Sequence, residues 1–239
     1  MSSKTEKIWA VIPAAGMGSR IGGVTPKQYL DLDGRKLIEH ALERLAAHPQ
    51  IAGIVVSISK QDQYWKTISL PADTTVIDVQ GGVERHHSVL NALMKLSGMI
   101  QADDWVLVHD SARPCVRYDD IDKLIRSLMD HPVGGILGVP VADTVKRVDG
   151  HHQIVDTVDR SGLWHAQTPQ MFRLGPLIKA IRHAIDIKAP ITDEAGAMEL
   201  MGFAPRIIEG HKDNIKVTEP QDLLLAAMYL EQQTRQVMP

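Results

Sequence analysis

Short apolar runs rich in β-branched residues alternate with amphipathic segments along most of the chain, and this alternation limits the fold more than any other feature. Five runs are predicted to be strands, at 7–12, 53–59, 74–79, 104–110 and 134–141. Their apolar residues are nearly continuous, which is typical of strands buried on both faces of a parallel sheet. The predicted fold is therefore α/β, with βαβ units in an open, three-layer, Rossmann-like arrangement around a mainly parallel sheet.

The segments between and after the strands have helical periodicity. Helices are predicted around 37–45, 121–129, 174–185, 192–202 and 219–233, because their apolar residues recur on one helical face. Thr192 or Asp193 is the expected N-cap of the fourth. A chain of 239 residues without a linker, repeat or low-complexity segment is expected to form one domain, 1–239.

The alternation changes after Pro140. Two β-like runs, 144–148 and 153–158, flank the dipeptide Asp149-Gly150, which is a strong hairpin signal. An isolated two-stranded hairpin is marginally stable in water, so this arm must pack on something. The pattern is compatible with packing on the hairpin's own domain and with packing on a second subunit.

Composition excludes several classes of protein. A net charge of −3 and 4% aromatic residues argue against a nucleic-acid-binding face. The single cysteine, Cys115, permits neither an internal disulfide nor a cysteine-based zinc site and points to a reducing, cytoplasmic compartment. No apolar run is long enough to span a membrane. The first apolar run is broken by Pro13 and Gly16, so it is predicted to be a strand and not a signal peptide.

A glycine-rich loop follows the first strand. It lacks the Walker A pattern, and its match to the dinucleotide fingerprint fails at Ile21, with Pro26 preventing an immediate regular helix. A third design places a nucleotide at the carboxyl end of the strand, with backbone N–H groups and the cations Arg20 and Lys27 around its phosphates. The spacing of these residues alone favours neither this nucleotide-binding loop nor an ordinary solvated surface loop.

Two further segments favour a phosphate-containing ligand. Residues 81–89 form a second glycine-containing turn before a helix, and Arg85 and Ser88 are placed there to contact a base, sugar or phosphate. Residues 108–114 end a buried strand with Asp110. In a phosphate-rich site one carboxylate is a natural Mg²⁺ ligand, because Mg²⁺ prefers one or two carboxylates together with phosphate oxygens.

Taken in order, these segments resemble the 2-C-methyl-D-erythritol 4-phosphate cytidylyltransferase family over nearly the whole chain. The matching segments are "PAAGMGSR", "PKQYL", "GG.ER..SV", "VHDSARP", "PVADTVKR", "TVDRSGLWHAQTPQMF", "ITDEA" and "DNIKVT". Two positions depart from the family: Val83 stands where some members have a nucleotide-contacting Asp, and Ser111 stands where Ala is expected.

The resemblance implies a nucleotidyltransferase fold that transfers CMP from CTP to 2-C-methyl-D-erythritol 4-phosphate, releasing pyrophosphate. The substrate phosphate attacks the α-phosphate in line, and no general base is needed because a phosphate monoester has a second pKa of about 6. Mg²⁺ is the implied cofactor, and a homodimer formed through the arm at about 141–160 is the implied assembly. The products serve the non-mevalonate route to isoprenoids.

The resemblance also assigns roles to residues. Arg20 and Lys27 are expected to stabilise charge at the α-phosphate, and Arg160 and Lys216 to hold the substrate phosphate. The expected CTP site comprises Pro13, Ala14, Ala15, Gly16, Gly18, Gly81, Gly82, Arg85 and Ser88. The expected polyol site comprises Asp110, Arg113, Thr144, Arg160 and Thr168, with Asp110 also holding the metal. Arg160 and Thr144 are expected to serve a pocket shared between subunits.

Two other functions compete. A cytidylyltransferase for another polyol phosphate, such as ribitol 5-phosphate, would share the nucleotide loops, and residues near Thr144, Arg160 and Thr168 would discriminate. A regulatory nucleotide-binding protein would be expected to lose a catalytic cation or the metal carboxylate, and none is lost here.

The adjacent pairs His86-His87 and His151-His152 are not expected to bind metal, because neighbours on a strand point to opposite faces. His109 is expected to be a hydrogen-bonded core residue.

Overall fold

A seven-stranded sheet forms the centre of the protein. The computed structural model describes residues 7–16 and 25–237. The strands are β1 (Ile8–Pro13), β4 (Ile51–Ile58), β5 (Thr75–Gln80), β6 (Trp105–Val108), β7 (Gly134–Pro140), β10 (Trp164–Arg173) and β11 (Arg206–Glu209). They run in the order β11-β7-β10-β6-β1-β4-β5, and every neighbouring pair is parallel except the two that involve β10. The predicted mainly parallel α/β fold is therefore confirmed.

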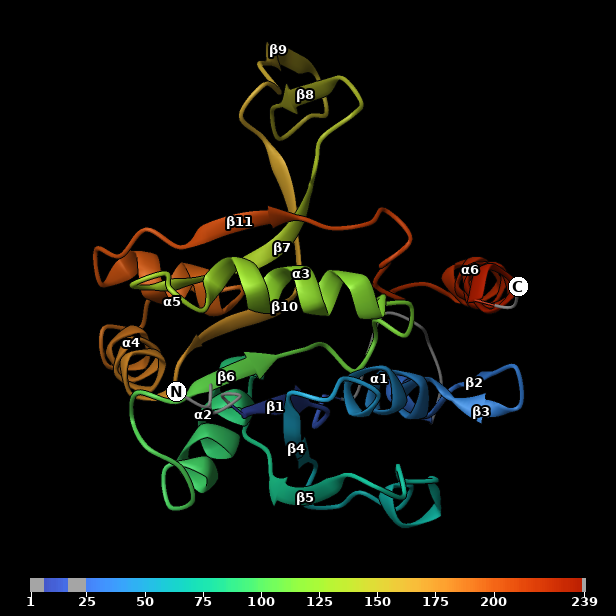
Figure 1. Ribbon diagram of the computed structural model, residues 1–239. Coiled ribbons are helices and arrows are strands. Elements are labelled where there is room, and N and C mark those ends of the chain that lie inside the picture. The colour runs from blue at the N-terminus through green and yellow to red at the C-terminus, as the bar shows by residue number, and fades with distance from the viewer. Residues whose placement is uncertain (1–6, 17–24, 238–239) are drawn as a thin grey trace.

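Helices cover both faces of the sheet (Figure 1). The helices α1 (Leu37–Ala46) and α3 (Tyr118–Leu128) pack on one face, and α2 (Arg85–Leu96), α4 (Leu174–Asp186) and α5 (Glu194–Leu200) pack on the other. Strand β1 shows why its sequence is continuously apolar: Ile8, Ala10 and Ile12 enter the first core and Val11 the second. All five predicted helices are present, and Asp193 is the N-cap of α5, accepting from the Gly196 N–H at 2.9 Å.

The last helix, α6 (Pro220–Val237), covers a third, smaller apolar cluster. Its Gln233 amide donates to the carbonyl of Cys115 at 3.0 Å and to Asp213 Oδ2 at 2.9 Å. This contact ties α6 to the segment that leads to Lys216. Among the described helices, none combines the length and apolar character needed to cross a bilayer.

Short elements complete the described chain. They are η1 (Lys27–Tyr29), β2 (Asp31–Leu32), β3 (Arg35–Lys36) and η2 (Trp65–Thr67). The pair β2–β3 is antiparallel and precedes α1. The position of η1 matters most for function, because the Gln28 side chain donates to the carbonyl of Ala14 at 2.6 Å and holds η1 against the end of β1.

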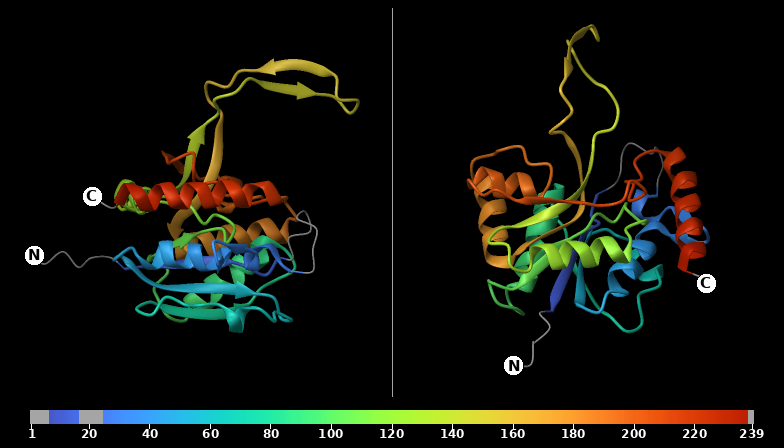
Figure 2. Two further views of the ribbon diagram at one scale, coloured as in Figure 1. Left: turned by 90° about the vertical axis from the view of Figure 1, so that its right-hand side faces the viewer. Right: turned by 45° about the horizontal axis from the view of Figure 1, so that its top comes forward.

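The predicted hairpin forms β8 (Val145–Val148) and β9 (Ile154–Val158), and it stands away from the body of the subunit (Figures 1 and 2). Its turn is longer than the dipeptide signal suggested. Asp149 accepts hydrogen bonds from the backbone of His151 and Gln153, and the positive φ falls at His152 and not at Gly150. Of the two packing alternatives, folding back onto its own domain is not observed.

Two strands of the sheet have no counterpart in the sequence prediction, β10 and β11. Strand β10 contains Pro169 and the buried polar residues Gln167, Thr168 and Gln170, so it lacks the apolar pattern of a central strand. Gln170 shows how such a residue is accommodated: its Oε1 accepts from the N–H groups of Glu194 and Ala195, and its amide donates to Asp193. The partners lie more than twenty positions away along the chain, so no local signal identifies them.

Candidate functional site

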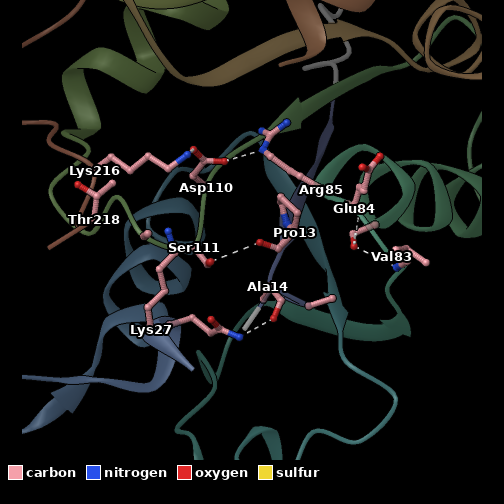
Figure 3. Close-up of a pocket in the computed structure, with 16 residues that line it drawn as sticks. Pro13, Ala14, Lys27, Val83, Glu84, Arg85, Asp110, Ser111, Lys216 and Thr218 are labelled. Atoms are coloured by element: carbon pink, nitrogen blue, oxygen red, sulfur yellow. Dashed lines mark hydrogen bonds and ion pairs between the residues drawn. The ribbon is translucent and has the colours of Figure 1, made fainter. Parts of the chain in front are cut away.

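A pocket of ≈ 290 Å³ opens at the carboxyl ends of β1 and β6 (Figure 3). The chain leaves β1 for β4 on one side and returns to β6 on the other, so the pocket lies at a topological switch point, where open α/β sheets bind their ligands. Ten residues of the predicted site line it: Pro13, Ala14, Ala15, Gly16, Lys27, Gly82, Arg85, Ser88, Asp110 and Lys216. The two departures from the family, Val83 and Ser111, also line it, as do Gln28, Glu84, Ala112 and Thr218.

The remaining predicted residues lie in three places. Gly81 is adjacent to the pocket wall, and Arg113 and Thr168 are largely buried behind Asp110. Thr144 and Arg160 are exposed on the arm, where the Arg160 guanidinium donates to the carbonyl of Ala142. Gly18 and Arg20 lie outside the described residues. Among the described residues, one subunit therefore brings together the predicted nucleotide-binding residues of the two loops, Lys27, Asp110 and Lys216, but not the arm residues.

Asp110 is the centre of charge in this pocket. It is 6% exposed, and its Oδ1 accepts from Arg85 Nε at 3.0 Å while its Oδ2 lies 2.8 Å from Lys216 Nζ. Burial by itself would raise the pKa of Asp110, but attraction to Arg85, Lys216 and Arg113 outweighs it and holds that pKa well below its usual range. Asp110 is therefore an ionised carboxylate at the pocket wall at any physiological pH.

Arg85 is clamped between two carboxylates. Its two terminal nitrogens lie 2.6 and 3.0 Å from the two carboxylate oxygens of Glu194, and its Nε donates to Asp110. Desolvation would lower the pKa of Arg85, but the two carboxylates more than compensate and raise it. The sequence identifies Arg85 as a candidate but not Glu194, although Glu194 lies within the family segment "ITDEA". With a side chain only 1% exposed, Glu194 fixes the guanidinium at the mouth of the pocket.

The loop that carries Lys216 is held by backbone contacts behind the pocket. Arg113 donates through Nη1 to the carbonyl of Asn214 at 2.7 Å, and the Asn214 amide donates to the carbonyl of Thr168 at 2.9 Å. The N–H of Val217 donates to the carbonyl of Ala112 at 2.8 Å. In this subunit Arg113 thus positions Lys216 through the main chain.

His109 belongs to a buried hydrogen-bonded chain, as predicted. Its Nε2 lies 3.0 Å from the carbonyl oxygen of Arg113, and its Nδ1 lies 3.0 Å from Thr168 Oγ1. Because a carbonyl oxygen only accepts, Nε2 carries the proton and Nδ1 accepts from the Thr168 hydroxyl. That hydroxyl in turn accepts from the N–H of Asp110 at 3.0 Å. The Thr168 hydroxyl therefore fixes the backbone of Asp110.

The buried hydrogen-bonded group around His109 predicts that the free energy of unfolding depends on pH. Burial lowers the pKa of His109 from 6.5 to about 4 in the folded protein. As pH falls from 7 to 5 the unfolded chain binds a proton at this site and the folded chain does not, so the free energy of unfolding should fall by about 2 kcal/mol from His109 alone. Urea unfolding of wild type and His109→Gln at both pH values measures it: the pH-dependent loss should be smaller in the variant by that amount.

The exposed His165 provides the matched control. His165→Gln should retain the full wild-type loss of stability between pH 7 and 5. An identical loss in wild type and His109→Gln would contradict the assignment. Comparing the pH-dependent loss of stability of each variant with that of wild type removes the contribution of His48, another buried histidine whose pKa is lowered by desolvation.

The glycines of the second loop are required by close packing. A Cβ on Gly81 would lie 2.3 Å from the Cβ of Ala15, and one on Gly82 would lie 2.3 Å from the Cβ of His87. The N–H of Gly82 donates to Ser88 Oγ at 3.0 Å, so Ser88 holds the turn against α2. Val83 projects from this turn with 98% of its surface exposed, and its apolar side chain cannot make the hydrogen bonds of the missing Asp.

The Ser111 hydroxyl donates to the carbonyl of Pro13 at 3.3 Å, which joins the ends of β1 and β6. This contact uses the additional hydroxyl for structure at the base of the pocket. The departure from Ala at this position therefore leaves the pocket wall in place.

Known proteins of one cytidylyltransferase family match this chain over nearly its whole length. A sequence model of the family described as IspD, 2-C-methyl-D-erythritol 4-phosphate cytidylyltransferase, matches residues 8–232. A relative of that name from Pseudomonas fluorescens strain SBW25 is 53% identical over 224 residues, which are 93% of this chain and 95% of the relative. The solved structure of the Francisella tularensis protein of that name has a TM-score of 0.79 at 36% identity and covers 94% of this chain and 100% of its own.

A further solved structure, described as 4-diphosphocytidyl-2C-methyl-D-erythritol synthase, gives a TM-score of 0.81 at 37% identity, covering 94% of this chain and 99% of its own. Sequence and fold thus agree over almost the full length of the chain. The protein therefore belongs to the 2-C-methyl-D-erythritol 4-phosphate cytidylyltransferase family.

Proposed function

We propose that this protein transfers the cytidylyl group of CTP to 2-C-methyl-D-erythritol 4-phosphate, giving 4-diphosphocytidyl-2-C-methyl-D-erythritol and pyrophosphate. The observation that carries the proposal is the ionised Asp110, flanked by Arg85 and Lys216 in a pocket at the switch point of the sheet. Family membership supplies the choice of substrates, since the geometry alone does not select cytosine or the polyol.

The chemistry suits a site built from fixed cations. The substrate phosphate is already mostly dianionic near neutrality, because its second pKa is about 6, so no residue must remove a proton. The barrier comes from bringing this anion to an anionic α-phosphate while pyrophosphate leaves, and positioned positive charge lowers it. In this proposal Lys27 and Arg20 stabilise the α-phosphate, while Lys216 and Arg160 hold the substrate phosphate for in-line attack.

Asp110 has the properties required of a Mg²⁺ ligand. It lines the pocket, remains ionised, and presents a carboxylate with about four lone-pair sites, of which Arg85 and Lys216 take two. Mg²⁺ needs only one or two carboxylates when phosphates and water complete its shell. Bound there, the ion would neutralise charge on the phosphates of CTP. The buried Glu194 is committed to Arg85 and is not assigned to the metal.

We further propose that the arm forms a homodimer. Val148, Ile154 and Val155 are exposed apolar residues on an isolated hairpin, which calls for a partner surface. Arg160 and Thr144 lie on the same arm, beyond the nucleotide pocket of their own subunit, so we assign them to the pocket of the other subunit. The buried, unpaired Cys115 suits the reducing cytoplasm as the compartment.

Mixing two inactive chains tests whether pockets are shared. Arg20→Ala and Arg160→Ala should each be inactive alone, and after subunit exchange the mixture should recover roughly a quarter of wild-type activity, because half of the dimers then carry one intact pocket. Co-purification with two different tags verifies that mixed dimers form. Mixed dimers without recovered activity would show that each subunit completes its own pocket.

Pyrophosphate release tests the function itself. With CTP and Mg²⁺, release should be rapid with 2-C-methyl-D-erythritol 4-phosphate as acceptor and near background with ribitol 5-phosphate. Release with ribitol 5-phosphate alone would keep the mechanism but overturn the substrate. A folded protein that binds CTP and releases no pyrophosphate with either acceptor would overturn the enzymatic function.

A further inference from the structure

Beside the nucleotide pocket, three side chains at the start of α2 gather three potential metal ligands. His86 Nε2 lies 3.1 Å from Glu84 Oε2, and His87 Nδ1 lies 3.8 Å from the same oxygen. The three ligand atoms all lie within 4.8 Å of one another, and no other such group of three occurs in residues 7–16 and 25–237. Glu84 also lines the nucleotide pocket, but none of the three side chains is assigned a role in the proposed transfer reaction.

We propose that Glu84, His86 and His87 form a binding site for one divalent transition-metal ion of the zinc class. Zinc bonds of about 2.0–2.1 Å in a tetrahedral shell separate the ligand atoms by about 3.4 Å. The two measured histidine–carboxylate distances fall on either side of that value. Three protein ligands leave the fourth position to water, and the exposed carboxylate of Glu84 gives an ion access from solvent.

His87 gives a second, independent reason for the site. Its Nδ1 is shielded from solvent and has no hydrogen-bond partner, although buried polar atoms nearly always have one. The nearest oxygen of Glu84 is too distant, at 3.8 Å, for a hydrogen bond. An ion placed between the two groups would satisfy both the nitrogen and the carboxylate.

The start of a helix changes the geometry expected for adjacent histidines. On a strand, neighbouring side chains point to opposite faces, but on a helix they diverge by only about 100°. In this structure the rings of His86 and His87 lie close together, with centroids 4.3 Å apart. Arg85, which lies between Glu84 and His86 in the sequence, is bound by Asp110 and Glu194, so its charge is balanced on the side of the nucleotide pocket.

This site differs in chemistry from the carboxylate of Asp110. Oxygen ligands and phosphates suit Mg²⁺, whereas imidazole nitrogens favour zinc and similar ions. The cluster is also joined to the pocket wall: the carbonyl of Glu84 accepts from the Ser88 N–H at 3.1 Å, and Ser88 Oγ accepts from the Gly82 N–H. A bound ion would therefore fasten the turn at 82–84 to α2 and raise the thermal stability of the protein.

Zinc binding by the intact chain, without a polyhistidine tag and in excess Mg²⁺, tests the proposal. Competition with a chromogenic chelator should give one equivalent of Zn²⁺ for wild type, and His86→Gln and His87→Gln should each weaken it at least tenfold. The arm offers a matched control in the adjacent pair His151 and His152, which belongs to no three-ligand group in the described chain. The double variant His151→Gln/His152→Gln should bind zinc as wild type does.

Two further measurements make the result decisive. Co²⁺ should give the visible absorption of a four-coordinate site in wild type and in the arm variant, but not in His86→Gln. The melting temperature should rise with Zn²⁺ in the same two proteins, and its value without metal verifies that every variant is folded. Equal zinc affinity in wild type and in the folded His86→Gln and His87→Gln variants would overturn the proposal, as would loss of binding in the arm variant.

Discussion

Asp110→Asn is expected to lower kcat/KM by about 10³-fold, because a metal ion at a phosphoryl centre contributes several kcal/mol of charge stabilisation. The same substitution removes the charge that pairs with Arg85 and Lys216, so the two cations would no longer be held at their present spacing. Steady-state pyrophosphate release at saturating Mg²⁺ measures the loss. Titration with Mg²⁺ should also show that the variant needs a higher concentration for its remaining activity.

The control for this experiment is a carboxylate outside the site. Asp130 is exposed near the end of α3, and Asp130→Asn should keep kcat/KM within about twofold of wild type, as surface substitutions usually do. Circular dichroism and melting temperature should show that Asp110→Asn remains folded. A folded Asp110→Asn protein with near wild-type kcat/KM would contradict the role given to this carboxylate.

Lys27→Ala should separate turnover from binding. Lys27 lines the nucleotide pocket from η1, and its charge is expected to act most strongly when negative charge develops around the α-phosphate. Removing one such preorganised group should lower kcat by about 10²–10³-fold. The dissociation constant for CTP should rise much less, because interactions that strengthen in the transition state affect turnover more than ground-state binding.

Pyrophosphate release gives kcat, and calorimetric titration of CTP gives the dissociation constant. Lys95→Ala, at an exposed position near the end of α2, is the matched control and should change neither quantity. Equal losses in kcat and in CTP affinity for Lys27→Ala would show that this cation binds ground state and transition state alike.

Much of the site could be predicted from the sequence because its residues follow strands. Ala14, Ala15 and Asp110 lie within two residues of the ends of β1 and β6, and parallel strands bring their carboxyl ends to one edge. Lys27 lies farther along the chain, in η1. Lys216 is identified only by resemblance to a family segment. The sequence does not identify Glu194, because its role depends on a contact with Arg85, 109 positions earlier, that only the packing of α2 and α5 against α4 creates.

The sequence by itself determined the α/β class, the arm and the helical faces, because hydrophobic periodicity is a local property that directly reflects which side of an element is buried. The tertiary structure alone decided the places of β10 and β11 and the clamp on Arg85. Strand β10 and the clamp depend on buried polar groups whose partners lie far away in the chain, and β11 is a short edge strand defined by its pairing with β7. Such pairings follow from how the elements pack, and no periodicity in the sequence records them.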